Sequence, residues 1–448
     1  MPKPGERQLH LGLNVLAAGM HPASWQLPGT DPLGYIRLSH WRRVAEIAEK
    51  GTLDAIFLAD GVNLPHLPTG QVAGPGNSFD PVALLSALAA VTTHVGLVPT
   101  ISTTIDSPFS LARRVSSLDH LSEGRAAWNI VTTWDSSTSL QFGGYRAERE
   151  ERYAQAVEFV DVVRALWDSW DDDALVADQA SGVFTRLNSI RAINHQGRFF
   201  SVKGPLNLPR SPQGRPVLFQ AGGSPGGLDL AARHADAVFA SLGTLDHALE
   251  YSADLRRRAV AYGRPADSIR VMPGLSFILG GTEAEARERA RVLNDLAGDK
   301  RLGGLARQLG VDVSELDWDK PLPQHLLDTA ELSPHSQGAR EIVLRIARRE
   351  TLTARQILER VQSWHRLVVG GPEQLADAIS EWFLAGAVDG FNLMPDVEPS
   401  GLEAFVEHVV PILRRKGIFR HEYTGTTLRD HLGLARPPNH FAAEVAAE

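Results

Sequence analysis

Residues 95–133, which open with VGLVPTIS (Val95–Ser102) and close with RAAWNIVTT (Arg125–Thr133), decide the fold. Both runs are apolar, have the length of a strand and contain several β-branched residues. Residues 103–124 lie between them, which is room for a crossover helix and far more than a hairpin needs. The stretch therefore predicts two parallel strands joined by a helix.

The same alternation extends outward in both directions along the chain. The intervening segments carry apolar residues on one helical face, as at Trp41, Val44, Ala45 and Ala48. Eight strands alternating with such helices predict an α/β fold, a (β/α)8 TIM barrel, with residues 1–448 as one domain. The six further strands are expected at His10–Leu16, Leu53–Ala59, Pro216–Ala221, Ala237–Leu242, Ile269–Leu279 and Gly390–Met394.

Two stretches interrupt this alternation, and we expect both to be insertions within the barrel. They are residues 171–208 and the longer stretch 282–365, which precedes the last strand. Residues 419–448 form a C-terminal tail whose first part, 419–434, is rich in polar and turn residues. We expect this part of the tail to reach across to a partner subunit.

The composition excludes several classes of function. The chain of 448 residues has 45 basic and 53 acidic side chains, so no overall positive charge attracts nucleic acid or an anionic membrane. It has no apolar run of membrane-spanning length and no secretory signal, which predicts a cytoplasmic protein. With no cysteine and no HExxH spacing, we expect no metal, so redox chemistry requires an organic cofactor.

The residues that close the predicted strands are unusually polar. Each of them has an alternative role as the cap of the following helix. Because the active site of a TIM barrel lies at the C-terminal ends of its strands, five polar ends together predict a ligand site there. These residues include Asp60, Thr100, Ser102, Thr103, Thr104, Asn129, Thr132, Thr133, Gln220, Gly222, Gly223, Ser224 and Asn392.

The glycine-rich turn at residues 221–227 opens a predicted helix. Glycines at that position let backbone N–H groups approach an anion such as a phosphate. The turn matches neither the dinucleotide motif GxGxxG nor the phosphate-binding motif GxxxxGK[ST], and the chain has no GxSxG serine elbow. The turn therefore predicts a phosphate contact of another kind.

Four segments together resemble a known family. SSLDHLSEGR (116–125), leading into AWNIVT (127–132), resembles the signature of the bacterial-luciferase-like flavin monooxygenases. LDAIFLAD (53–60), VDGFNLM (388–394) and YTGTTLR (423–429) resemble the subgroup of nitrilotriacetate, dibenzothiophene-sulfone and long-chain-alkane monooxygenases. The resemblance extends from about Leu9 to Pro437.

This resemblance implies the oxygenase component of a two-component monooxygenase. Reduced FMN from a separate NAD(P)H-dependent flavin reductase would react with O2, form a C4a-(hydro)peroxyflavin and transfer one oxygen atom to a small organic substrate. It also implies a homodimer or a homotetramer. The alternatives are an F420-dependent oxidoreductase of the same superfamily and a flavin-binding protein without catalysis.

The resemblance also implies roles for individual residues around FMN. Where the family has a histidine before the tyrosine that matches Tyr153, this chain has Arg149, which can pair with a phosphate through two hydrogen bonds. The flavin ring is expected beside Asp60 and Thr100, its polar edges at Asn129 and Thr133, and its phosphate at Arg149, Tyr153, Gly223 and Ser224.

A second set of residues is expected near the substrate. His21 follows the first strand and is the candidate catalytic residue, although a lone histidine is as often a structural hydrogen-bonding residue. Relatives place a histidine near the substrate from the long insertion, where this chain offers Arg307. The expected pocket residues are Trp25, Phe57, Trp134 and Arg307.

Overall fold

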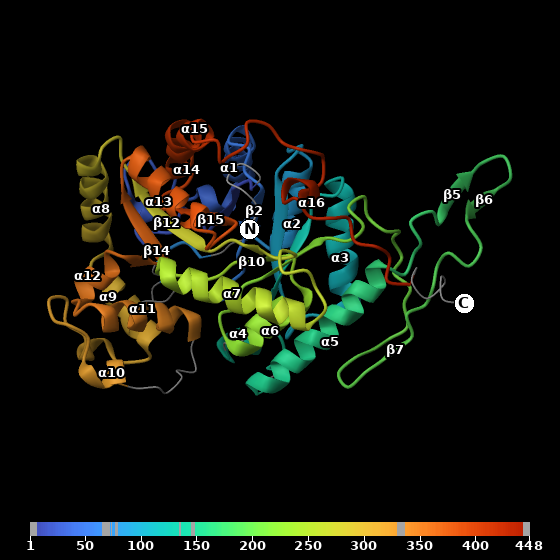
Figure 1. Cartoon of the computed structure of the whole chain (residues 1–448), viewed down its shortest axis with the longest axis horizontal. Helices are drawn as coiled ribbons and strands as arrows, with labels where there is room; N and C mark the ends of the chain where they lie inside the picture. Colours follow the sequence, from blue (N-terminus) through green and yellow to red (C-terminus); the bar gives the residue numbers. More distant parts are fainter. Residues whose placement is uncertain are drawn as a thin grey trace.

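The computed structural model describes residues 7–64, 72, 74–76, 79–133, 136–144, 148–328 and 337–441 of the chain. In this part, an eleven-stranded and mostly parallel sheet curls through the middle of the molecule, with helices packed around it (Figure 1). The predicted α/β fold is confirmed. None of the described helices is long and apolar enough to cross a membrane.

The strands follow the order that a (β/α)8 barrel requires. β11 pairs with β10, and β12, which continues the same segment, pairs with β15. Since β15 also pairs with β1, the row of strands curls back to its beginning. In chain order these strands are β1 (His10–Val15), β2 (Ala55–Leu58), β3 (Gly96–Ser102), β4 (Ala127–Val131), β9 (Val217–Gln220), β10 (Ala237–Val238), β11 (Arg270–Val271), β12 (Gly274–Leu279) and β15 (Gly390–Pro395).

The strand expected at Ile269–Leu279 is divided in two. Its halves, β11 and β12, are separated by Met272 and Pro273. Proline has no backbone N–H to donate to a neighbouring strand, so the ladder is interrupted there. The division lets one segment serve both of its neighbours in the sheet.

A short hairpin that the sequence did not predict follows the long helical region. β13 (Val361–Gln362) pairs antiparallel with β14 (His365–Gly370), and β14 pairs parallel with β12. The turn between them consists of Ser363 and Trp364 and lacks the glycine or asparagine typical of a two-residue hairpin turn, so the sequence carries no hairpin signal. The hairpin spans the C-terminal boundary of the stretch 282–365, which was expected to be an insertion.

The helices bury the apolar faces that the sequence predicts. In α1, the side chains of Trp41, Val44, Ala45 and Ala48 are all buried. The outer layer contains α1 (Leu38–Lys50), α2 (Pro81–Ala89), α3 (Pro108–Leu121), α4 (Ser136–Gln141), α5 (Arg149–Trp167), α6 (Pro225–His234), α7 (Leu245–Ala261), α8 (Glu283–Ala297), α13 (Pro372–Leu384), α14 (Ser400–Ala404), the π-helical turn η4 (Phe405–Val409) and α15 (Val410–Arg415).

Residues 300–358 form a group of helices with a hydrophobic core of its own. The group gathers at the end of the molecule opposite the hairpin β5–β6 (Figure 1). By contrast, α8 packs on β12 and β14 and so belongs to the layer around the sheet. The helices of the group are α9 (Lys300–Leu309), η3 (Val313–Glu315), α10 (Gln324–Asp328), α11 (Gln337–Arg349) and α12 (Ala354–Leu358).

The stretch 171–208 contains two small hairpins outside the main sheet. The first joins β5 (Leu175–Asp178) to β6 (Val183–Thr185), and the second joins β7 (His195–Gln196) to β8 (Ser201–Val202). The β5–β6 hairpin projects from the molecule (Figure 1) and exposes the apolar side chains of Phe184 and Leu187 around it.

The segment 419–434, for which the sequence predicts a contact with a partner subunit, packs on its own chain. Leu428 in α16 (Leu428–His431) and Leu432 are fully buried against the first residues of β2, β3, β4 and β9. The fit is so close that a Cβ on Gly96 would lie 2.6 Å from Leu428 Cδ1. These two leucines fill the N-terminal opening of the barrel. The sequence did not predict this role, because the residues around them are mostly polar.

Candidate functional site

At the opposite opening, neighbouring strands bring Thr100 and Asn129 together. The two residues are partners in the β3–β4 register, and Asn129 Nδ2 donates to Thr100 Oγ1 at 3.0 Å. Asn129 is only 2% exposed, and its Oδ1 has no hydrogen-bond partner. A buried amide oxygen without a partner is costly. This atom is therefore suited to accept a hydrogen bond from a ligand.

A chain of hydroxyl groups continues from there along the strand ends. Thr133 Oγ1 donates to Ser102 Oγ at 2.7 Å, and Ser102 Oγ accepts from the backbone N–H of Thr104 at 3.1 Å. Thr133 itself is half-buried, so the chain of hydroxyls ends near the opening. Thr100 and Asn129 thus lie on adjacent strands, and Thr133 follows the second of these strands.

The residues expected at the phosphate meet at the start of α6. Tyr153 Oη and Ser224 Oγ are 2.8 Å apart, and Ser224 Oγ also accepts from the N–H of Gly227 at 3.2 Å. A Cβ on Gly226 would lie 2.7 Å from the ring of Tyr153, so only glycine lets the ring pack there. Gly223 is exposed immediately before the first turn of the helix, at its positively polarised N-terminus. This end can hold a phosphate.

Two of the expected residues cannot be placed in detail. α5 begins at Arg149, on the turn of helix that precedes Tyr153, but its side chain lies outside the described structure. Trp134 lies outside the described residues altogether. Their proposed roles therefore stay predictions.

Asp60 follows β2 and is exposed. Partial desolvation and the nearby carboxylate of Asp80 raise its pKa, and the backbone N–H of Gly61 opposes that shift. Its position after a strand agrees with the sequence prediction, and its side chain is exposed among the described residues.

His21 is buried and both of its ring nitrogens are engaged. Nδ1 accepts from the N–H of Ala23 at 3.2 Å, so Nε2 carries the proton and donates to Asn294 Oδ1, also at 3.2 Å. Burial, and then the positive charge of Arg301, lower the pKa of the His21 imidazole to about 4. The residue is therefore neutral near pH 7, and transfer of its proton requires the bond to Asn294 to break.

The expected substrate residues lie in different surroundings. Trp25 is half-buried, and its buried Nε1 has no partner among the described residues. Phe57 is fully buried in the barrel and meets the rings of Phe219 and Phe239 edge-on, at centroid distances of 5.8 and 5.0 Å. Arg307 is exposed near the end of α9, so the structure does not bring it together with the strand ends.

Arg301, which the sequence analysis did not select, lies where Arg307 was expected to act. Its guanidinium donates to the carbonyl of Leu358 and acts electrostatically on His21. Burial lowers the pKa of Arg301 to about 10, which leaves it cationic at neutral pH. Within the described residues no carboxylate lies at ion-pair distance from it. A cation of this kind suits an anionic ligand.

Two buried carboxyl groups lie at the end of β15. Asp396 pairs with Arg289, whose Nε is 2.5 Å from Asp396 Oδ2. Both oxygens of Glu398 lack a partner, and burial together with the charge of Asp396 raises the pKa of Glu398 well above its usual value. Glu398 is thus protonated under conditions in which an exposed glutamate is ionised.

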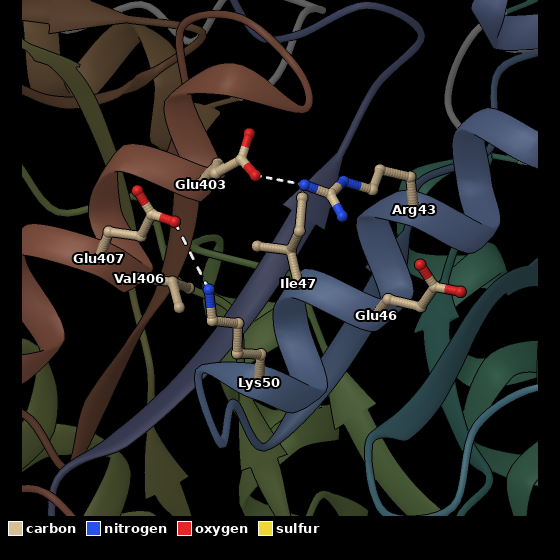
Figure 2. A pocket seen from close by; sticks show the side chains of 7 residues that line it. All are labelled: Arg43, Glu46, Ile47, Lys50, Glu403, Val406 and Glu407. Carbon is tan, nitrogen blue, oxygen red and sulfur yellow. Dashed lines mark hydrogen bonds and ion pairs between the residues drawn. The ribbon is translucent and has the colours of Figure 1, made fainter.

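A groove elsewhere on the surface has different features. It lies between α1 and the α14–η4 segment (Figure 2), away from the strand ends. Two ion pairs cross it, Arg43 with Glu403 and Lys50 with Glu407, so its charges are already compensated. The residues that line it are Arg43, Glu46, Ile47, Lys50, Glu403, Val406 and Glu407. This groove is therefore a packing contact between two helical segments, and we do not assign it a ligand.

Comparison with known proteins gives a consistent result. Residues 16–389 match the family described as luciferase-like monooxygenase. The chain is 42% identical over 446 residues to N-acetyl-S-(2-succino)cysteine monooxygenase of Bacillus subtilis (strain 168), covering 98% of this chain and 99% of the relative. It is 40% identical to nitrilotriacetate monooxygenase component A of Aminobacter aminovorans, covering 97% and 98% of the two chains.

Comparison with solved structures supports the same family. A riboflavin lyase determined with modified FMN and riboflavin is 34% identical, with a TM-score of 0.82 over 97% of this chain and 98% of that one. The F420-dependent tetrahydromethanopterin reductase of Methanopyrus kandleri is 15% identical with a TM-score of 0.55, covering 90% of this chain and 99% of that one. The second likeness is one of fold alone.

Proposed function

Since the chain belongs to the luciferase-like monooxygenase family, we propose that it is the oxygenase component of a two-component FMN-dependent monooxygenase. The observation that carries this proposal is the buried, unpaired Oδ1 of Asn129 beside Thr100, at the end of the barrel that also holds the start of α6. An F420-dependent oxidoreductase stays the alternative, supported by fold alone.

The described residues fit FMN. Asn129, with Thr100 and Thr133 beside it, offers polar atoms to the edge of a flavin ring. Tyr153 and Ser224 hold the phosphate end, where the N-terminus of α6 favours a negative charge. Gly223 leaves the backbone there open to the ligand. Arg149, which begins α5 one turn before Tyr153, would add a positive charge to the same end. Asp60 lies beside the ring.

The chain's own residues create the conditions for the reaction. Bound reduced FMN supplies the reaction with O2 that delivers one oxygen atom to the substrate. The layer of Phe57, Phe219 and Phe239 closes the barrel beneath the site and keeps water out. His21 keeps its proton on Nε2 in the bond to Asn294 and is a candidate to hold or donate that proton. Trp25 lines the pocket.

A separate NAD(P)H-dependent flavin reductase is the partner that this function requires. Such a reductase supplies reduced FMN, and O2 and the organic substrate complete the reaction. The relative from Aminobacter aminovorans is named as component A, which supports a second component for this chain as well.

The substrate is a small compound with several carboxylates. The two relatives described above are named for N-acetyl-S-(2-succino)cysteine and nitrilotriacetate, which both carry carboxylate groups. In this chain, Arg301 supplies a cation without an ion-pair partner beside His21. An exposed Arg307 can attract such a substrate from solution, but the interior contact belongs to Arg301.

The chain acts as one domain and as a homo-oligomer. Residues 1–448 form a (β/α)8 barrel with insertions at 171–208 and 282–365 and a tail at 419–448, in a cytoplasmic homodimer or homotetramer. The exposed apolar side chains around the β5–β6 hairpin support self-association. Light scattering of the purified protein measures its mass, and a monomer would contradict this part of the proposal.

Anaerobic titration with reduced FMN, followed by mixing with oxygenated buffer and candidate substrates, tests the function. We expect tight binding of reduced FMN, and O2 consumption that yields oxygenated product rather than H2O2 when a suitable polycarboxylate is present. Failure to bind reduced FMN, together with binding of F420, would support the alternative instead.

A further inference from the structure

The hairpin β13–β14 presents two polar side chains on one face. Gln362 and His365 are partners in the antiparallel register, so their side chains point to the same side of the hairpin. The turn between them is strained, because Ser363 (φ 47°) and Trp364 (φ 69°) both adopt the left-handed region without being glycine. Ser363 Oγ donates to the carbonyl of Met20, which places the turn next to His21.

This face points into the barrel, toward the strand ends. The ring of His365 stacks on Phe239 at 5.0 Å and 12°, and Phe239 in turn meets Phe57 inside the barrel. A Cβ on Gly274 would lie 2.4 Å from His365 Nδ1, so the imidazole rests directly on the backbone of β12. Ser276 Oγ donates to the carbonyl of Gln362 and fixes the other side of the hairpin.

Three polar atoms of these two side chains have no partner among the described residues. Gln362 is 7% exposed and neither its Oε1 nor its Nε2 is hydrogen-bonded. His365 is also 7% exposed, and its Nδ1 is buried without a partner. Asn14 on β1, which β15 separates from β12 in the sheet, is 4% exposed, and its buried Oδ1 is unpaired among the described residues. Buried polar groups are normally paired, so three unpaired groups at one opening point to a ligand.

This cluster lies across the opening from the proposed flavin residues. Gln362, His365 and Asn14 belong to β13, β14 and β1, whereas Thr100, Asn129 and Ser224 belong to β3, β4 and the loop after β9. A ligand that satisfies the cluster therefore faces the flavin. This is the position that a substrate must occupy.

The chemistry of the cluster selects a neutral group. Burial alone lowers the pKa of the His365 imidazole to about 3, with no charged group acting on it, so the ring is neutral near pH 7. A carboxylate only accepts hydrogen bonds and would leave Gln362 Oε1 unpaired, while an ammonium only donates and would leave Nε2 unpaired. An amide both donates and accepts, and it brings no charge into a buried site.

We propose that Gln362 and His365, with Asn14, bind a neutral amide group of the substrate and hold it opposite the flavin. The proposal rests on the function proposed above and extends it: Arg301 takes a carboxylate of the substrate, and the hairpin takes an amide. The three residues act in binding and positioning, and no proton or electron is transferred through them.

Two compounds that differ only in this group provide the test. N-acetyl-S-(2-succino)cysteine carries an amide where S-(2-succino)cysteine carries an ammonium. Calorimetry measures the binding of each compound to the protein without cofactor and with oxidised FMN. Oxygenation with a flavin reductase present gives KM and kcat separately. We expect the wild-type protein to bind the N-acetyl compound at least about tenfold more tightly than the free amine.

The variants Gln362→Met and His365→Phe keep the size of each side chain and remove its hydrogen-bonding atoms. Each should bring the affinities for the two compounds to within about threefold of each other, and should raise KM more than it lowers kcat. His431→Phe is the matched control. His431 is also buried with both ring nitrogens unpaired, but it lies in α16 at the other end of the barrel. The His431→Phe variant should still bind the N-acetyl compound more tightly than the free amine.

The outcomes separate the two proposals. If the wild-type protein binds both compounds equally, or binds neither, the hairpin does not recognise an amide. If both variants keep the preference, other residues provide it. If they weaken FMN binding instead, the cluster belongs to the flavin site and the inference is wrong. Amide preference in calorimetry without any oxygenation would contradict the proposed function and leave this inference supported. Since the two variants are independent, failure of one to fold leaves the other as the test.

Discussion

The residues that carry the family resemblance act mainly as structural supports. Arg125 is buried and donates hydrogen bonds to the carbonyls of Ala89, Thr92, Val95 and Ser122. These bonds fix the entry to β4, on which Asn129 follows four residues later. Arg125 thus positions the site without contacting it, whereas Asn129, in the same part of the sequence, belongs to the proposed site itself.

Asn129→Leu should weaken FMN binding about tenfold or more. The change removes the amide that bonds Thr100 and presents an unpaired oxygen to the ligand, and a lost buried hydrogen bond costs about 1–3 kcal/mol. Anaerobic fluorescence titration measures the affinity, and circular dichroism verifies the fold. An unchanged affinity in a folded variant would remove Asn129 from the cofactor site.

Glu398→Gln should stabilise the protein at alkaline pH. The pKa of Glu398 is raised in the folded state, so the native chain retains a proton that the unfolded chain loses. The native state is therefore penalised increasingly as the pH rises above the unfolded pKa of about 4.3. The increase in the free energy of unfolding that Glu398→Gln causes should be larger at pH 8 than at pH 5.

Urea unfolding at both pH values measures this difference. Glu403→Gln is the control, because Glu403 is an exposed partner of Arg43 and contributes little at either pH. A stabilisation of Glu398→Gln that does not vary with pH would show that Glu398 is already ionised in the folded protein.

At the level of secondary structure, each end of the barrel is completed by a short element. The N-terminal opening is closed by α16, which buries Leu428 and Leu432, and the C-terminal opening is bordered by the hairpin β13–β14. The glycines at positions 96 and 274 allow both close approaches. One element therefore contributes stability, and the other contributes unpaired polar atoms to the site.

Leu428→Ala should lower the free energy of unfolding by about 2–5 kcal/mol, as expected for a leucine removed from a packed interior. FMN affinity should stay within about twofold of wild type, because Leu428 lies at the other end of the barrel. Urea unfolding and flavin titration test the two statements. Leu384→Ala, on the exposed surface of α13, is the matched control and should change stability little. A large loss of flavin affinity in Leu428→Ala would mean that the two ends are coupled.

At the scale of the whole molecule, the site combines elements that are distant in the sequence. β1, β4, α6 and β14 all contribute side chains to one opening, and the helical group α9–α12 adds Arg301 beside it. A ligand bound there contacts several parts of the barrel at once. Binding should therefore be coupled to the stability of the whole fold.

FMN at 100 times its dissociation constant should raise the free energy of unfolding by about 2.7 kcal/mol, because the ligand binds only the folded chain. Riboflavin at the same concentration should stabilise less, since it has no phosphate for the start of α6. Tyr153→Phe should reduce the difference between the stabilisation by FMN and that by riboflavin, because the hydrogen bond between Tyr153 Oη and Ser224 Oγ is lost. Equal stabilisation of the wild-type protein by both ligands would rule out the phosphate contact.

The sequence by itself determined the alternation of strands and helices and the family, and it predicted flavin-binding residues on β3, on β4 and before α6. These features depend on local periodicity and short motifs, which are present before the chain folds. It did not reveal the turn at Ser363 and Trp364, the burial of Leu428, or the proximity of Arg301 to His21. Only the tertiary structure decided which polar atoms stay unpaired, because Asn14 and His365 are 351 positions apart along the chain and their surroundings exist only once the barrel has formed.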